Sequence, residues 1–185
     1  MKKILTIIYL LLIFSSSLTA QRMFPNQIGV EFNAGLLQQE ISKNYYAGVG
    51  MVVHSGKGHY STYSFEYDRR IIDYKETAIA VETYMGLGGY SFNLISDRSR
   101  NFVINVSLYV IAGYEKINSG NTALYDGAQL ISESSFMYGA GGGLSLETYL
   151  SDRWVLIISG RAKVLWNTSG KLLNPSLGIS IRFNL

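Results

Sequence analysis

Strict alternation between apolar residues and small or polar residues, repeated along most of the chain, most constrains what this sequence can fold into. The clearest case begins at Phe102, where every second residue up to Tyr114 is aliphatic, aromatic or alanine and several of those between are polar or glycine. A period of two is typical of a β-strand whose two faces meet different surroundings. The same pattern recurs in eight segments, at residues 28–36, 45–53, 63–68, 79–88, 102–115, 136–150, 154–166 and 177–185. We therefore predict an all-β protein of about eight strands.

The connections between these segments alternate broadly in length. Residues 38–44, 70–78, 118–135 and 167–174 form longer connections, whereas 55–59 and 151–152 are tight, and 95–101 is a polar connection. Outer-membrane barrels have long external loops and short periplasmic turns, and strands of roughly 9–11 residues cross the bilayer at a tilt. The pattern predicts an up-and-down antiparallel transmembrane β-barrel with both termini on the periplasmic side.

Composition indicates which face of each strand meets lipid. One face is aliphatic and aromatic, and in the fourth segment we assign Ile79, Val81, Thr83, Met85 and Leu87 to it. The opposite face carries Gly, Ser, Asn and charged residues, which can be buried only if they are paired or hydrogen-bonded. Because an eight-stranded barrel is just wide enough for side chains to fill, we predict a packed polar interior and not a pore. The predicted interior network comprises Glu31, Glu66, Glu82, Glu147, Arg161, Lys163 and Arg182.

The first 20 residues have the parts of a secretory signal peptide. Lys2 and Lys3 precede an uncharged apolar run that ends in a polar stretch before Ala20. That run is too short for a bilayer-spanning helix. We predict a cleaved signal at residues 1–20 and a single outer-membrane barrel domain at 21–185.

Charge and cysteine content exclude several classes of protein. The chain has no Cys, which excludes thiolate metal sites, cysteine nucleophiles and a lipid-modified cysteine at the signal. Removal of Lys2 and Lys3 would lower the 16 basic residues by two, against 13 acidic ones, so the mature chain is nearly neutral. A protein that binds nucleic acid directly needs a larger basic surplus, and we expect no such binding.

A soluble lipocalin-like barrel is the main alternative fold. Its apolar face points inward and its outer surface carries many charges, whereas the strands here have few. The chain also ends on an apolar strand with Phe183 and Leu185 at alternate positions, which looks like the terminal signal read by the outer-membrane barrel-assembly machinery. The membrane barrel is the favoured interpretation, with outer-membrane lipids and the assembly machinery as expected partners.

Few residues of the sequence are candidates for catalysis or for binding a metal or cofactor. His54 and His59 flank a tight turn, and a His beside a Ser could serve a lipid A-modifying enzyme, but no Asp or Glu is placed beside them to orient a base. The glycine runs at 86–89 and 139–143 are not strand-to-helix transitions and lack the helix N-terminus of a phosphate-binding loop. Asp126 and Glu133 are too few for a calcium site, which needs six or more oxygens. We predict no catalytic residue, no cofactor and no metal.

Several motifs, in consistent order over essentially the whole mature chain, are similar to a known family. They are NYYAGVG at 44–50, ETY at 82–84, GGYSF at 88–92, AGYE at 112–115, LYDGA at 124–128, YGAGG at 138–142, LETYLSDR at 146–153, KVLW at 163–166 and GISIRF at 178–183. With these motifs the chain resembles the TraO conjugal transfer proteins of Bacteroidetes conjugative transposons. The resemblance implies a non-enzymatic role in the outer-membrane part of a conjugative DNA-transfer apparatus, with other apparatus proteins as partners.

Three functions follow, in order of preference. A filled barrel cannot pass DNA, so the first is an anchoring or organising component of the transfer apparatus. For this role we predict a partner-contact surface in the longest loop, at Leu124, Tyr125, Asp126 and Gly127, because loops on a rigid scaffold commonly carry recognition. The second is a general outer-membrane protein for adhesion or envelope stability. The third is a lipid A-modifying barrel enzyme.

Overall fold

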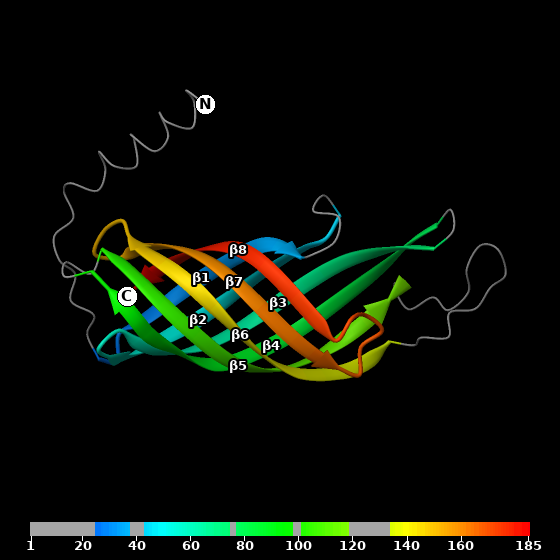
Figure 1. Cartoon of the computed structure of the whole chain (residues 1–185), viewed down its shortest axis with the longest axis horizontal. Coiled ribbons are helices and arrows are strands. Elements are labelled where there is room, and N and C mark those ends of the chain that lie inside the picture. Colours follow the sequence, from blue (N-terminus) through cyan, green and yellow to red (C-terminus); the bar gives the residue numbers. More distant parts are fainter. Residues whose placement is uncertain (1–24, 38–42, 75–76, 98–100, 119–133) are drawn as a thin grey trace, which may run out of the picture.

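The described residues form a closed barrel of eight strands (Figure 1). The computed structural model describes residues 25–37, 43–74, 77–97, 101–118 and 134–185. Its strands are β1 (Ile28–Leu37), β2 (Tyr45–Gly56), β3 (His59–Tyr74), β4 (Thr77–Ser96), β5 (Phe102–Ile117), β6 (Ser135–Tyr149), β7 (Trp154–Trp166) and β8 (Leu173–Asn184). Within the described ranges, no helix is long and apolar enough to span a membrane.

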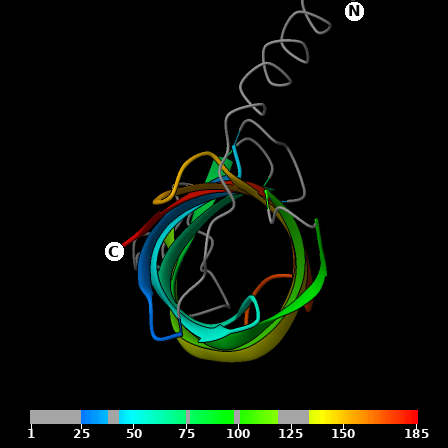
Figure 2. The same ribbon diagram turned by 90° about the vertical axis from the view of Figure 1, so that its left-hand side faces the viewer.

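Every strand pairs antiparallel with its neighbours in sequence, and the barrel is closed between the first and last strands. β1 pairs with β8 from Gly29↔Asn184 to Leu37↔Ser176, so no sheet edge is left open. Figure 2 shows the resulting ring end-on. The up-and-down, eight-stranded antiparallel barrel predicted from the alternation is confirmed.

The two ends of the barrel differ. We call the end with the β2–β3, β4–β5 and β6–β7 connections the turn end, and the other the loop end. At the turn end, Lys57 and Gly58, both with positive φ, form the β2–β3 turn, and the C-terminal Leu185 donates its backbone N–H to Ile28. The turn end lies on the left of Figure 1.

One predicted loop is wrong. Residues 70–78 were expected to form a loop, but β3 and β4 stay paired from Arg70↔Val81 to Tyr74↔Thr77. β2 pairs with β3 only as far as Arg69, and β5 pairs with β4 only from Val81. The tip of this hairpin is therefore a two-stranded ribbon that reaches past the β7–β8 connection (Figure 1). Its β-branched residues, among them Ile71, Ile72 and Ile79, favour extended backbone.

On seven of the eight strands the face predicted to meet lipid is the outward face. Phe32 is 63% exposed, Val110 68% and Leu177 63%, and they lie on three different strands. Aromatic pairs lie near both rims: Trp154 and Phe183, with ring centroids 4.8 Å apart, at the turn end, and Tyr138 and Trp166, 5.8 Å apart, at the loop end. An apolar band edged by aromatic rings is the surface that a bilayer requires.

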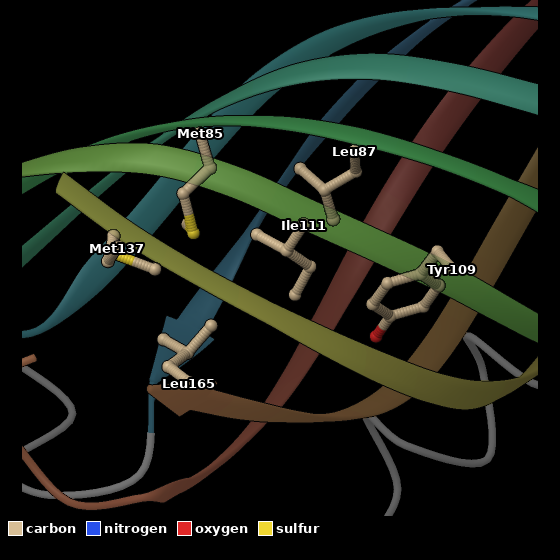
Figure 3. Packing of buried hydrophobic residues seen from close by; sticks show 6 residues of the cluster. All are labelled: Met85, Leu87, Tyr109, Ile111, Met137 and Leu165. Carbon is tan, nitrogen blue, oxygen red and sulfur yellow. The ribbon is translucent and has the colours of Figure 1, made fainter. Parts of the chain in front are cut away.

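The face assignment of β4 is the exception, and here the prediction is wrong. Met85 and Leu87 are buried and point inward, where they pack with Ile111, Met137 and Leu165 (Figure 3). Pairing with β3 sets this orientation, because residues directly opposite each other share a face. The outward-facing Tyr67 lies opposite Tyr84, so the row that contains Glu82 must also point outward.

Glycines make room inside the barrel where a large side chain crosses it. A Cβ added to Gly178 would overlap the hydroxyl of Tyr46, whose side chain is 1% exposed. A Cβ on Gly35 would meet the same ring. The narrow interior therefore accommodates its tyrosines opposite residues that lack a side chain.

Candidate functional site

Most of the described charged side chains inside the barrel form two separate clusters. The first, which we call the loop-side cluster, joins β3 to β7. Glu66 accepts a hydrogen bond from Arg161 Nη1 at 2.8 Å and forms an ion pair with Lys163, which also contacts Asp68 Oδ2 at 3.1 Å. Arg161 lies over the ring of Tyr46, with 4.3 Å between its Cζ and the ring centroid. Two acids and two bases thus neutralise one another inside the barrel, where only Arg161 keeps a small exposed fraction, 15% of its side chain.

The second, the turn-side cluster, is centred on Arg182 of the last strand. Its Nη1 and Nη2 donate to the two carboxylate oxygens of Glu147 at 3.2 and 3.1 Å, and its Nη2 and Nε donate to Glu31 Oε2 at 3.0 and 3.1 Å. Tyr60 donates its hydroxyl to Glu147 at 2.6 Å, and its ring lies 4.3 Å from the Arg182 Cζ. The planar guanidinium suits such two-pronged contact with carboxylates.

Both clusters link strands that are not neighbours in the barrel. β3 and β7 are separated by three strands in one direction, and β8 and β6 by β7. The ion pairs of Glu66 with Arg161 and Lys163, and of Glu147 with Arg182, therefore link strands that share no ladder, whereas Arg182 and Glu31 lie directly opposite each other on β8 and β1. Buried charges cost several kcal/mol each to desolvate, so removing one partner is far more damaging than removing a surface pair.

A small cavity lies between the two clusters. It has a volume of about 80 Å³ and is bordered by Tyr109, Arg161, Glu31 and a set of hydroxyl and amide side chains, namely Asn33, Tyr60, Thr62, Ser64, Ser107, Ser145, Ser159 and Ser180. Asn33 Oδ1, Ser145 Oγ and the Nε and Nη2 of Arg161 are buried there without a protein partner. A polar cavity of this size has room for a few water molecules. It is not a passage for a macromolecule.

Six of the seven residues predicted for the interior network lie inside the barrel. All six make the contacts described above, and Glu31 lies at the edge of the turn-side cluster. Glu82 is the exception and corrects the prediction: it lies on the outer face, where it accepts a hydrogen bond from the Tyr67 hydroxyl at 2.9 Å. The pairing with β3 described above places it there.

The predicted interior network omitted Asp68, Tyr60 and Glu115. Asp68 lies two residues after Glu66 and shares its face, so the alternation alone could have identified it. Tyr60 and Glu115 also follow the inward parity of their strands. The predicted contact residues Leu124, Tyr125, Asp126 and Gly127 lie outside the described residues.

Polar contacts also hold the connection between β7 and β8 over the loop end. The buried carboxylate of Glu115 accepts hydrogen bonds from the Thr168 hydroxyl at 2.7 Å, from the Ser169 backbone N–H at 2.8 Å and from the Ser169 hydroxyl at 2.6 Å. On the far side of the mouth, Arg70 Nη1 donates to Asn174 Oδ1 at 2.8 Å. These bonds fold residues 167–174 inward across part of the opening.

The two histidines make structural contacts. His54 is 1% exposed and packs edge-on against Tyr60, with ring centroids 5.5 Å apart. His59 accepts the backbone N–H of Asn93 on Nδ1 at 3.0 Å and stacks on Tyr90. Across the described part of the chain, no three His, Asp or Glu side chains are grouped to hold a metal ion.

Solved structures similar to this one are small outer-membrane barrels. Neisserial surface protein A matches with a TM-score of 0.51 and 10% identity, covering 86% of this chain and 95% of its own. The N-terminal β-barrel domain of Pseudomonas aeruginosa OprF matches with a TM-score of 0.48 and 12% identity over 86% of this chain and 98% of its own. Ail of Yersinia pestis gives 0.49 and 14%, over 85% and 97%. At these identities the likeness to Neisserial surface protein A concerns the fold alone.

A comparison with curated proteins gives no match. Comparison with family models does: the model described as conjugative transposon protein TraO matches residues 24–185, which include all eight strands. The resemblance drawn from the motifs is thereby confirmed. The chain belongs to the TraO family of conjugative transposon proteins.

Proposed function

We propose that this protein is an outer-membrane component of a conjugative transfer apparatus and that its role is to anchor or organise that apparatus. Family membership supports the connection with conjugation. The apolar outer band and closed barrel support a place in the outer membrane, reached behind a signal peptide at residues 1–20 with the help of the barrel-assembly machinery.

The observation that carries the structural role is the filled lumen. Two ion-pair clusters cross the interior, and the cavity between them measures only about 80 Å³. A strand of DNA cannot pass such a barrel without unfolding it. We infer that the protein acts through its surfaces, neither as a conduit nor as an enzyme, and that it makes no direct contact with nucleic acid.

The same topology supports an orientation. The even strand number places both ends of the barrel chain at the turn end, which we assign to the periplasm. The loop end, with residues 118–134 and the β3–β4 ribbon, then faces outward. We propose that Leu124, Tyr125, Asp126 and Gly127 in the longest loop contact another protein of the apparatus.

Conjugation from a donor that lacks the gene tests this function. We expect transfer frequency to fall by orders of magnitude and to return when the wild-type gene is supplied in trans. A gene lacking codons 123–131 should produce a barrel with normal heat-modifiable gel mobility but fail to restore transfer. Normal transfer from the donor that lacks the whole gene would contradict the proposal.

The alternatives predict different phenotypes for the same donor. A protein of adhesion or envelope stability would leave transfer intact and change detergent sensitivity or cell attachment. A lipid A-modifying enzyme would change the mass of lipid A, and the change would be reproduced by His54→Ala. We expect unchanged lipid A, since His54 is buried inside the barrel, where it packs against Tyr60.

A further inference from the structure

The mouth of the barrel at the loop end contains a pocket of about 370 Å³ that differs in charge from the rest of the interior. Its border includes Arg70, Lys171, Asn44, Asn174 and Gly170, and no Asp or Glu is among the described residues that line it. The volume lies in the range of small-molecule sites in proteins. We call it the mouth pocket.

Among the described residues, the basic groups of the mouth pocket form no ion pair. Arg70 makes one side-chain hydrogen bond, to the neutral amide of Asn174, and its Nε and Nη2 atoms are buried with no partner. Every other arginine in the lumen is paired with a carboxylate. Buried donors are almost always satisfied, so an unpaired guanidinium beside a pocket marks a place where a partner is missing.

The acids that face this region are already engaged. Asp68, two residues before Arg70 on β3, contacts Lys163, and Glu115 accepts three hydrogen bonds from Thr168 and Ser169. Their contacts point down into the barrel or hold the β7–β8 connection. Asp68 attracts Arg70 electrostatically but makes its direct contact with Lys163, so the Nε and Nη2 atoms of Arg70 remain open for hydrogen bonds to a ligand.

We propose that the mouth pocket binds a phosphate group, with Arg70 as its principal ligand and Lys171 as a second cation at the rim. A guanidinium offers two parallel N–H groups to phosphate oxygens, and a lysine adds a point charge. The phosphate comes either from a lipopolysaccharide in the outer leaflet or from a soluble phosphate ester. The proposal is independent of the role in conjugation, because it is tested on the purified protein.

The first experiment titrates inorganic phosphate into the full-length protein in neutral detergent micelles at low ionic strength, followed by calorimetry. We expect Arg70→Gln to weaken binding about tenfold or more, as loss of a charge-assisted hydrogen bond does. Arg69→Gln is the matched control, because Arg69 lies on the same strand but on the opposite face, beside Glu82. It should bind like the wild type.

A second variant tests the pocket without changing its charge. A Cβ on Gly170 would lie 2.9 Å from Arg70 Nη1, so Gly170→Ala should displace the guanidinium and also weaken binding. Heat-modifiable mobility confirms that each variant is folded. Absence of phosphate binding by the wild type, or equal affinity of the Arg70→Gln and Arg69→Gln variants, would overturn the proposal.

Competition identifies the source of the phosphate. Vesicles that contain lipopolysaccharide should displace inorganic phosphate if the ligand is a lipid headgroup, and vesicles with enzymatically dephosphorylated lipopolysaccharide should not. If neither vesicle competes, the site is assigned to soluble phosphate esters. Equal competition by both vesicles would show that phosphate is not the recognised group and would contradict the proposal.

Discussion

The stability cost of substituting a residue inside this barrel depends on which charged or hydrogen-bonding groups the substitution leaves without a partner. Lys163 neutralises both Glu66 and Asp68, and none of the three side chains is more than 1% exposed. Without Lys163, Glu66 keeps its ion pair with Arg161, but Asp68 keeps no ion pair with any described residue. The energetic cost of a substitution here comes mostly from the charge left behind.

We therefore predict that Lys163→Met destabilises the barrel by about 3–5 kcal/mol, the usual penalty for breaking a buried ion pair. Reversible urea unfolding in micelles, followed by tryptophan fluorescence, measures the change. Lys171→Met is the control, because Lys171 is exposed and makes no ion pair in the described structure. Equal stability of the two variants would show that the loop-side cluster does not contribute to folding.

Glycine positions give a second prediction at this scale. Gly178→Ala places a methyl group on the Tyr46 hydroxyl and should cost about 1–3 kcal/mol through overpacking. Gly160→Ala, on the outer face with no atom within 4 Å of the added Cβ, should be close to neutral. The same unfolding assay compares them, and a Gly178→Ala protein as stable as Gly160→Ala would contradict the packing described for Tyr46.

At the scale of the strand, most of the fold could be predicted from the sequence because side-chain alternation is a local property. The strands β1, β5 and β8 have faces so different that the pattern fixes which side is buried. β4 could not be assigned in this way, because Met85 and Leu87 suit a lipid face and a small apolar core equally well. Only pairing with β3 decides between the two, and pairing is not visible in the sequence of one strand.

The orientation of β4 can be tested with introduced cysteines, because the chain has none of its own. We predict that a spin label at Gly86→Cys is reached by oxygen dissolved in the bilayer, whereas one at Thr83→Cys is not, since Thr83 is buried inside. Val110→Cys on the outer face of β5 is the positive control. Oxygen contact at position 83 together with protection at 86 would restore the original assignment.

The candidate site could likewise be predicted only in part. The facing of each residue depends on its own strand, whereas the contacts between residues depend on how the strands are arranged. The inward parity of Glu66, Arg161 and Arg182 follows from alternation, so their presence in the lumen is predictable. Their sorting into two clusters depends on the stagger of eight strands and on which side chains meet across the lumen. Hydrophobic periodicity fades near the hairpin tip, so the sequence does not reveal that Arg70 belongs to a strand.

At the scale of the whole molecule, the filled lumen predicts that the barrel conducts few or no ions across a bilayer. In planar bilayers the purified protein should show no stable channel of porin-like conductance, since ion pairs and tyrosines occupy the cross-section. A sixteen-stranded porin in the same bilayer serves as the reference. A steady, large conductance that survives further purification would contradict both the closed interior and the proposed structural role.

The position of Arg182 in the chain sets an order of events during assembly. Its partners Glu31 and Glu147 are synthesised first and lie 151 and 35 residues earlier, on β1 and β6. Until β8 arrives, these carboxylates have no guanidinium and are best kept in water, because an unpaired charge in the bilayer is costly. Burial of the lumen is thus coupled to closure of the barrel by β8, and a barrel truncated before its last strand retains a hydrated, negatively charged interior that opposes insertion.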